Sequence, residues 1–123
     1  MGNKIIIKTG TIEAIAELND TDTARAIRDN LPITGQVNRW GDEIYFGISL
    51  SLEPDNGKDV VNIGDLAYWP PGAAFCIFFG ATPAAQGDEC RAASNVNVFG
   101  NVTGDLSDLW NIPDGAPIQI VKA

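Results

Sequence analysis

Arg39 is the first residue of this sequence whose type and position could do chemistry. Strand alternation places it on the same face as Ile33 and Val37, at the end of a predicted strand. An arginine at the end of a strand can present its guanidinium to a bound molecule as a hydrogen-bond donor. Asp42 and Glu43 follow closely enough to engage Arg39 themselves. We therefore favour an ion pair that braces the intervening turn, with a catalytic arginine as the alternative.

Aromatic and acidic side chains near this arginine are candidates for ligand contact. Glu43 and Tyr45 alternate with apolar neighbours, so they are expected to point away from the core. In a later apolar strand, Phe78 or Phe79 could line a pocket while its neighbour fills the core. Aromatic residues at strand spacing more often pack in the core, so packing is the favoured interpretation for each of them.

The polar loop Thr82–Arg91 supplies the remaining candidates. It contains Gln86 and Arg91 beside two acids, and it is long enough to close over a bound molecule. As a solvated loop the same segment needs no function. The predicted site residues are Arg39, as the catalytic candidate, and Glu43, Tyr45, Phe78, Gln86 and Arg91, as ligand-binding candidates. We expect Arg39 and Tyr45 to share one cleft with this loop.

Other chemistries have little support. The chain has no histidine, which removes the usual transition-metal ligand, the common nucleophile pairs and the default general base near neutral pH. Neither a Gly-x-Gly-x-x-Gly motif nor a phosphate-binding loop is present, so no nucleotide cofactor is indicated. Neighbouring acids such as Asp88 and Glu89 would point to opposite faces of a strand and make poor acid–base couples. We expect no cofactor and no metal.

The elements that must position these residues are mostly strands. The predicted strands are 4–8, 11–18, 33–39 paired with 43–48, 66–69, 74–79, 96–102 and 117–122. The segments 66–69 and 74–79 flank Pro70-Pro71-Gly72 and form a predicted hairpin-like unit, with Phe75, Ile77 and Phe79 on one face and Cys76 on the other. The segment 53–58 is a predicted loop, and residues 105–110 are compatible with one helical turn.

One helix is predicted, from about Thr21 to Asn30. Asparagine, aspartate and threonine side chains before it can cap its first turn, and Pro32 stops it. Ala24, Ile27 and Leu31 share a narrow apolar stripe, which suits a helix lying across one end of a barrel. Strands followed by one helix and more strands, with no βα repeat, indicate a closed or nearly closed barrel.

Three motifs carry a resemblance to a known family. Arg-Trp-Gly-Asp-Glu-Ile-Tyr-Phe at 39–46, Gly-Asp-Leu-Ala-Tyr-Trp-Pro-Pro-Gly at 64–72 and Phe-Phe-Gly-Ala-Thr-Pro at 78–83 resemble the cyclophilin-like proteins of prokaryotes, whose function is undefined. The resemblance implies a closed cyclophilin-like β-barrel capped by one or two short helices. In cyclophilins, an arginine and an aromatic pocket bind proline. Here Gly47 stands where the family's glutamine is expected, and the pocket histidine and tryptophan have no counterpart.

Composition limits the class of partner. The chain has 123 residues and is expected to form a single domain over residues 1–123. Its net charge of −8 disfavours nucleic acid and anionic membrane surfaces as partners. Its start reads as a strand rather than a secretory signal, so we expect a cytoplasmic location with Cys76 buried and Cys90, in a loop, unpaired with it.

These observations favour a binding domain that holds a peptide segment or a small molecule in the predicted cleft. A weak peptidyl-prolyl isomerase that uses Arg39 is the first alternative. A structural or regulatory module is the second.

Overall fold

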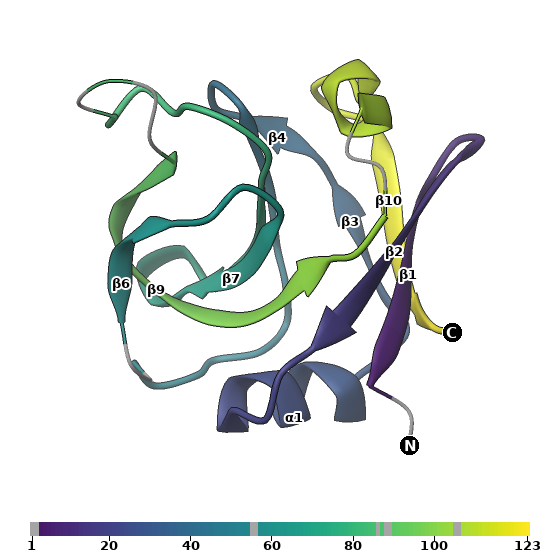
Figure 1. Ribbon diagram of the computed structural model, residues 1–123. Helices are drawn as coiled ribbons and strands as arrows, with labels where there is room; N and C mark the ends of the chain where they lie inside the picture. The colour runs from purple at the N-terminus through teal and green to yellow at the C-terminus, as the bar shows by residue number, and fades with distance from the viewer. Residues whose placement is uncertain (1–2, 55–56, 86, 88–89, 105–106) are drawn as a thin grey trace.

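The computed structural model describes residues 3–54, 57–85, 87, 90–104 and 107–123 (Figure 1). Strands predominate. They are β1 (Lys4–Thr9), β2 (Ile12–Leu18), β3 (Ile33–Gln36), β4 (Asn38–Arg39), β5 (Glu43–Gly47), β6 (Lys58–Val61), β7 (Asp65–Trp69), β8 (Ala74–Phe78), β9 (Cys90–Val102) and β10 (Pro117–Lys122). The helices are α1 (Asp22–Asp29) and two short 3₁₀ segments, η1 (Pro70–Gly72) and η2 (Ser107–Asn111).

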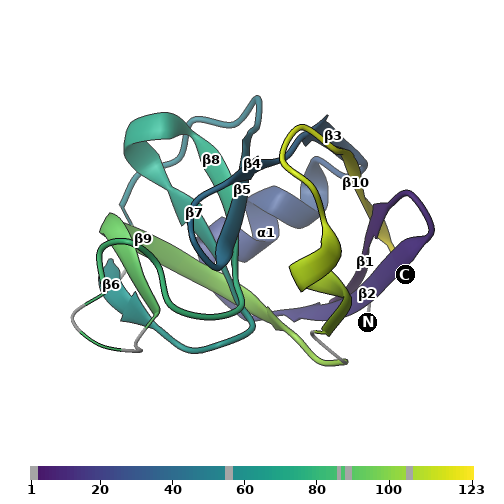
Figure 2. The same ribbon diagram turned by 90° about the horizontal axis from the view of Figure 1, so that it is seen from above.

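The strands form one antiparallel, strongly curled sheet in the order β3-β10-β1-β2-β9-β7-β8-β5-β4, with β6 paired to β9 (Figure 2). The predicted closure into a barrel is wrong, because β3 and β4 end the order without pairing to each other. These two end strands are consecutive in the chain and are separated by Val37. The Val37 backbone bonds Ala116 and Gly115 in the segment before β10 (2.8 and 2.6 Å). The backbone therefore passes from one end of the sheet to the other at Val37.

The main hydrophobic core fills the inside of the curled sheet. The Phe75 ring lies 5.0 Å from both the Phe46 and the Phe99 rings, centroid to centroid. Ile77 and Phe79 belong to this core, so the predicted inner face of β8 is confirmed. Burying such side chains contributes roughly 1.5–3 kcal/mol each, which makes this core the main source of stability.

Helix α1 lies across one end of the curled sheet (Figures 1 and 2). Its boundaries agree with the prediction, and the Thr21 hydroxyl accepts a hydrogen bond from the Ala24 backbone N–H (3.1 Å). Ala24 and Ile27 are buried in the main core, while Leu31 packs at its margin. The short apolar stripe is therefore sufficient to anchor the helix.

A second, smaller core covers the outer face of β7 and β8. It forms because β9 is long and changes partner along its length, pairing first with β6 and then with β7 and β2. The first half of β9 folds back over the outer face of β7 and β8. The buried residues of this second core are Val61, Ala67, Ala74, Cys76, Phe78, Cys90, Ala92 and Val96.

Three local predictions need correction. The segment 33–39 pairs with β5 only through Asn38 and Arg39, because residues 33–36 pair with β10 instead. Strand β6 begins at Lys58, the last residue of the predicted loop, and β9 begins at Cys90, earlier than the strand predicted over 96–102. Cys90 is therefore a buried strand residue rather than a loop residue, although both cysteines are free. In each case a distant strand supplies the pairing.

Candidate functional site

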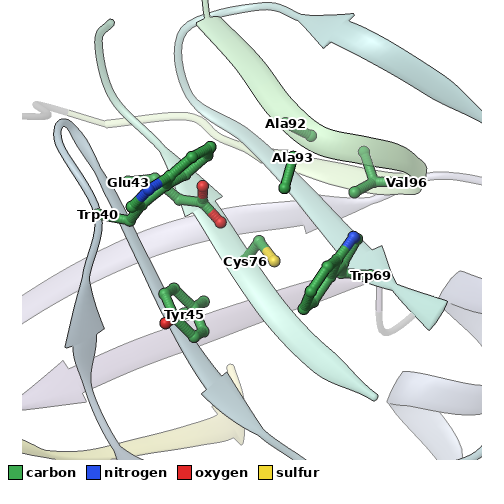
Figure 3. A pocket seen from close by; sticks show the side chains of 8 residues that line it. All are labelled: Trp40, Glu43, Tyr45, Trp69, Cys76, Ala92, Ala93 and Val96. Carbon is green, nitrogen blue, oxygen red and sulfur yellow. The ribbon is translucent and has the colours of Figure 1, made fainter. Parts of the chain in front are cut away.

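A pocket of about 250 Å³ opens on the outer face of the sheet, beside the second core (Figure 3). Strands β5, β7 and β8 form its floor, and the folded-back half of β9 forms its opposite wall. Eight residues line it, namely Trp40, Glu43, Tyr45, Trp69, Cys76, Ala92, Ala93 and Val96. Three of the eight are large aromatic residues and only one is an acidic residue, so the pocket is an apolar, aromatic recess around a carboxyl group.

Strand alternation explains why these side chains meet. Tyr45 lies opposite Cys76 in the β5–β8 ladder, and Glu43, two residues earlier in β5, points to the same face. Trp69 lies on the outer face of β7, whereas its neighbour Tyr68 points into the main core. The pocket floor is thus formed by three neighbouring strands, and along each strand every second side chain points to this face.

The turn between β4 and β5 sets the position of Trp40 and Glu43. The backbones of Trp40 and Glu43 hydrogen-bond each other in both directions (2.9 and 3.2 Å). Gly41 adopts a left-handed φ of 61° and fits closely against Pro83, which a β-carbon would approach to 2.7 Å. Asp42 fixes the turn to the end of β8, because its backbone bonds both Ala81 and Phe79 (2.9 Å each). The turn is therefore held rigidly from both sides.

Glu43 is the chemically distinctive group of the pocket. Only 5% of its surface is exposed, and this burial raises the pKa of its carboxyl group from 4.5 to about 7. A hydrogen bond with the Cys76 thiol opposes this rise in pKa only in part. Desolvation and the adjacent Glu43 raise the pKa of Cys76 well above its usual value, so the thiol stays protonated near neutral pH. The pocket therefore holds a carboxyl group poised to change charge near pH 7.

Small residues on β9 leave room for a ligand. Ala92 and Ala93 face the aromatic floor, and Ser94 accepts a hydrogen bond from the Trp69 indole N–H (2.7 Å). Figure 3 shows the Trp40 and Trp69 indoles on opposite sides of the Glu43 carboxyl and the Cys76 thiol. The indole bond to Ser94 fixes one ring, so the recess is preformed on that side.

Arg39 lies outside this pocket. Its guanidinium stands 5.2 Å from the centroid of the Phe79 ring, which belongs to the main core. It donates hydrogen bonds to the carbonyl groups of Gly41 and Ile112 (3.3 and 3.2 Å) and forms a 4.0 Å ion pair with Asp42. The expected cleft that would combine Arg39 with Tyr45 is therefore not formed, because the two side chains take opposite faces of the sheet.

Of the other predicted site residues, some line the pocket and some lie outside it. Glu43 and Tyr45 line the pocket. Phe78 is fully buried in the second core, where it serves packing. Arg91 forms a 2.7 Å ion pair with Asp59 and lines an open groove that adjoins the pocket. Gln86 lies outside the described residues.

Sequence reasoning missed Trp40, Trp69 and the alanines of β9. The alternation of side chains along β7 and β8 could have indicated part of the site, because it places Trp69 and Cys76 on the outer faces of their strands. No local pattern indicated that the residues after Cys90 would fold back over this face.

Within the described part of the chain, no group of three or more cysteine, aspartate or glutamate side chains is arranged to hold a metal ion. Its helices include none with the length and apolar character needed to span a membrane.

In the residues that the structure describes, a curled antiparallel sheet with α1 across one end defines a mainly β protein with a cyclophilin-like architecture. The model of the Cyclophilin-like family matches residues 3–121, so the chain belongs to that family. The resemblance inferred from the three sequence motifs is thereby confirmed.

Solved structures agree with this assignment. The hypothetical protein AF2241 from Archaeoglobus fulgidus is 41% identical, with a TM-score of 0.82 over 99% of this chain and 95% of that chain. McbB, whose structure was determined in complex with tryptophan, is 12% identical with a TM-score of 0.71. That alignment covers 95% of this chain but 44% of McbB, and it shows likeness of fold alone. No match was found among curated proteins.

Proposed function

We propose that this chain is a binding domain for a small organic molecule, which it holds in the pocket between Trp40 and Trp69. The observation that carries the proposal is the pocket itself, an aromatic recess of about 250 Å³ built around one buried carboxyl group. Ligand sites in proteins are typically apolar concavities with a few polar groups that orient the ligand. A recess of this size has room for a compact organic molecule.

A peptide side chain is the second candidate ligand. An open groove lined in part by Pro54, Asp59, Pro70 and Arg91 shares Ala92 and Ala93 with the pocket. A peptide lying in this groove could therefore insert one side chain into the recess. The groove offers hydrogen-bonding groups along its length, which an extended backbone requires.

The indole N–H signals of Trp40 and Trp69 in NMR spectra report on the pocket directly, because both residues line it. Suitable probes are indole, phenethyl alcohol and L-tryptophan, the last because it is the ligand of McbB, a protein of similar fold. We expect saturable shifts of the Trp40 and Trp69 signals.

The variant Ala93→Trp tests the location, because it fills the recess from a solvent-exposed position. It should abolish these shifts, while Ala123→Trp at the exposed chain end should retain them. Shifts that persist in Ala93→Trp would place the binding site elsewhere.

A further inference from the structure

The Glu43 carboxyl group lacks the partner that a buried charge needs. Buried carboxylates in proteins are normally paired with a cation or kept neutral. The ion pairs in the described part of the chain are Arg25–Asp22, Arg39–Asp42 and Arg91–Asp59, and none of them includes Glu43. The Cys76 thiol beside it is uncharged and cannot neutralise a carboxylate. The pocket thus presents an unneutralised carboxyl group to whatever enters it.

The surroundings of Glu43 favour a positive ligand. The aromatic rings of Trp40, Tyr45 and Trp69 line the same recess, and the face of an aromatic ring attracts cations, most strongly when water is excluded. The chain also has a net charge of −8, which attracts cations and repels anions at long range. A carboxyl group surrounded by indole and phenol rings is the chemistry that recognises organic ammonium ions.

We infer that the ligand of this pocket is an organic ammonium ion, bound with its positive group against the Glu43 carboxylate and the rings of Trp40, Tyr45 and Trp69. This inference rests on the proposed function and names the chemical class of its ligand. The ammonium group can belong to a free amine or to a lysine side chain of a peptide in the adjoining groove. Both present the same chemistry to Glu43.

Matched pairs of probes separate charge from shape. Choline is compared with its neutral carbon isostere, dimethylbutanol, and phenethylamine with phenethyl alcohol. A blocked lysine is compared with a blocked norleucine to test the peptide source. By calorimetry at about pH 8, the cation of at least one pair should bind about tenfold more tightly than its neutral partner. The pair that shows the difference identifies the source of the ammonium group.

The preference should depend on the charge of Glu43. The other titratable groups that line the pocket are the Cys76 thiol and the Tyr45 hydroxyl, while β7 and β9 contribute only Trp69, Ala92, Ala93 and Val96. Choline carries a permanent charge, so any change of its affinity with pH comes from the protein. Its affinity should fall about tenfold or more between about pH 8 and about pH 5.5, as Glu43 takes up a proton.

Variants complete the test. Glu43→Gln should abolish the preference for the cation, while Glu13→Gln, at an exposed position of β2, should retain it. The pH series on the unmodified chain decides the matter if Glu43→Gln does not fold. Equal binding of both members of every pair, or binding of neutral members alone, would overturn this inference and leave the proposed function intact. Binding of neither member of any pair would overturn both.

Discussion

The Glu43 carboxyl group is held where its charged form is disfavoured. Its pKa is about 7 in the folded chain and near 4.5 when it is exposed in the unfolded chain. Between these two values the folded state binds one proton more than the unfolded state, so stability is lost as the pH rises through this window. At 1.36 kcal/mol per pKa unit, the loss amounts to about 3 kcal/mol above pH 7.

Glu43→Gln removes this titration while keeping the size of the side chain. The free energy of unfolding of the variant, relative to the unmodified chain, should rise by about 3 kcal/mol between about pH 4.5 and about pH 8. Urea unfolding at several pH values measures it. The control is Glu13→Gln, whose stability should follow that of the unmodified chain at every pH. Parallel pH profiles for Glu43→Gln and the unmodified chain would show that Glu43 titrates normally.

At the scale of elements, the turn between β4 and β5 is the part on which the site depends most. It carries Trp40 and Glu43, and its Gly41 combines a left-handed backbone with close contact to Pro83. Gly41→Ala should destabilise the fold by about 1–3 kcal/mol, because alanine is strained at a left-handed φ and its methyl group would be too close to Pro83. It should also weaken ligand binding in the pocket.

Gly47 provides the matched control for the turn. It lies at the end of β5, where an added β-carbon meets no atom within 4 Å and no left-handed φ is required. Thermal unfolding of Gly47→Ala should resemble that of the unmodified chain. A similar loss of stability in both variants would show that the turn makes no special demand for glycine.

Helix α1 covers one end of the main core, and a substitution on its buried face tests how much that cover contributes to stability. Ile27 is fully buried there, so Ile27→Asp would place an unpaired charge among apolar side chains. The variant should lose about 3 kcal/mol or more in the free energy of unfolding. Ile15→Asp makes the same chemical change at a β2 position that is 49% exposed, and it should change stability by less than about 1 kcal/mol. An unchanged melting temperature for Ile27→Asp would show that the helix does not seal the core.

At the scale of the whole molecule, membership of the Cyclophilin-like family conveys a fold and not an activity. Prolyl isomerisation faces a barrier of about 20 kcal/mol, and lowering it takes an apolar slot beside a guanidinium that is available to the substrate. In this chain, Arg39 bonds two backbone carbonyl groups and stacks on Phe79, while the aromatic pocket lies on the other face of the sheet.

We therefore expect isomerase activity on a short Ala-Pro peptide to be absent or orders of magnitude below that of a true cyclophilin. Any residual rate should disappear in Arg39→Ala. A protease-coupled assay measures both. Rapid turnover that Arg39→Ala abolishes would favour the isomerase alternative over a binding domain.

Much of the fold follows from local sequence. Thr21, the Ala24–Ile27 stripe and Pro32 predicted α1 to within a residue or two. Strict alternation assigned Phe75 and Ile77 to the inner face of β8 and Cys76 to the outer face. These features depend on backbone periodicity and capping, which neighbouring residues control.

The candidate site was only half predictable from the sequence. Alternation correctly turned Glu43 and Tyr45 away from the main core, but it suggested solvent beyond them, whereas Glu43 is almost fully buried. The sequence analysis also placed Arg39 in the same cleft as Tyr45, whereas Arg39 pairs with Ile44 and Asn38 pairs with Tyr45, so the Arg39 and Tyr45 side chains lie on opposite faces of the sheet.

The alternation of side chains along a strand determines which face of the sheet each residue lies on. For Glu43 and Tyr45 the sequence by itself determined that face. What lies on that side depends on partners distant in the chain. The folding back of β9 over β7 and β8, and the bonding of Val37 to the segment before β10 in place of sheet closure, are settled by long-range pairing and packing. Only the tertiary structure therefore shows that Glu43, which points away from the main core, is buried as a carboxyl group within an aromatic pocket.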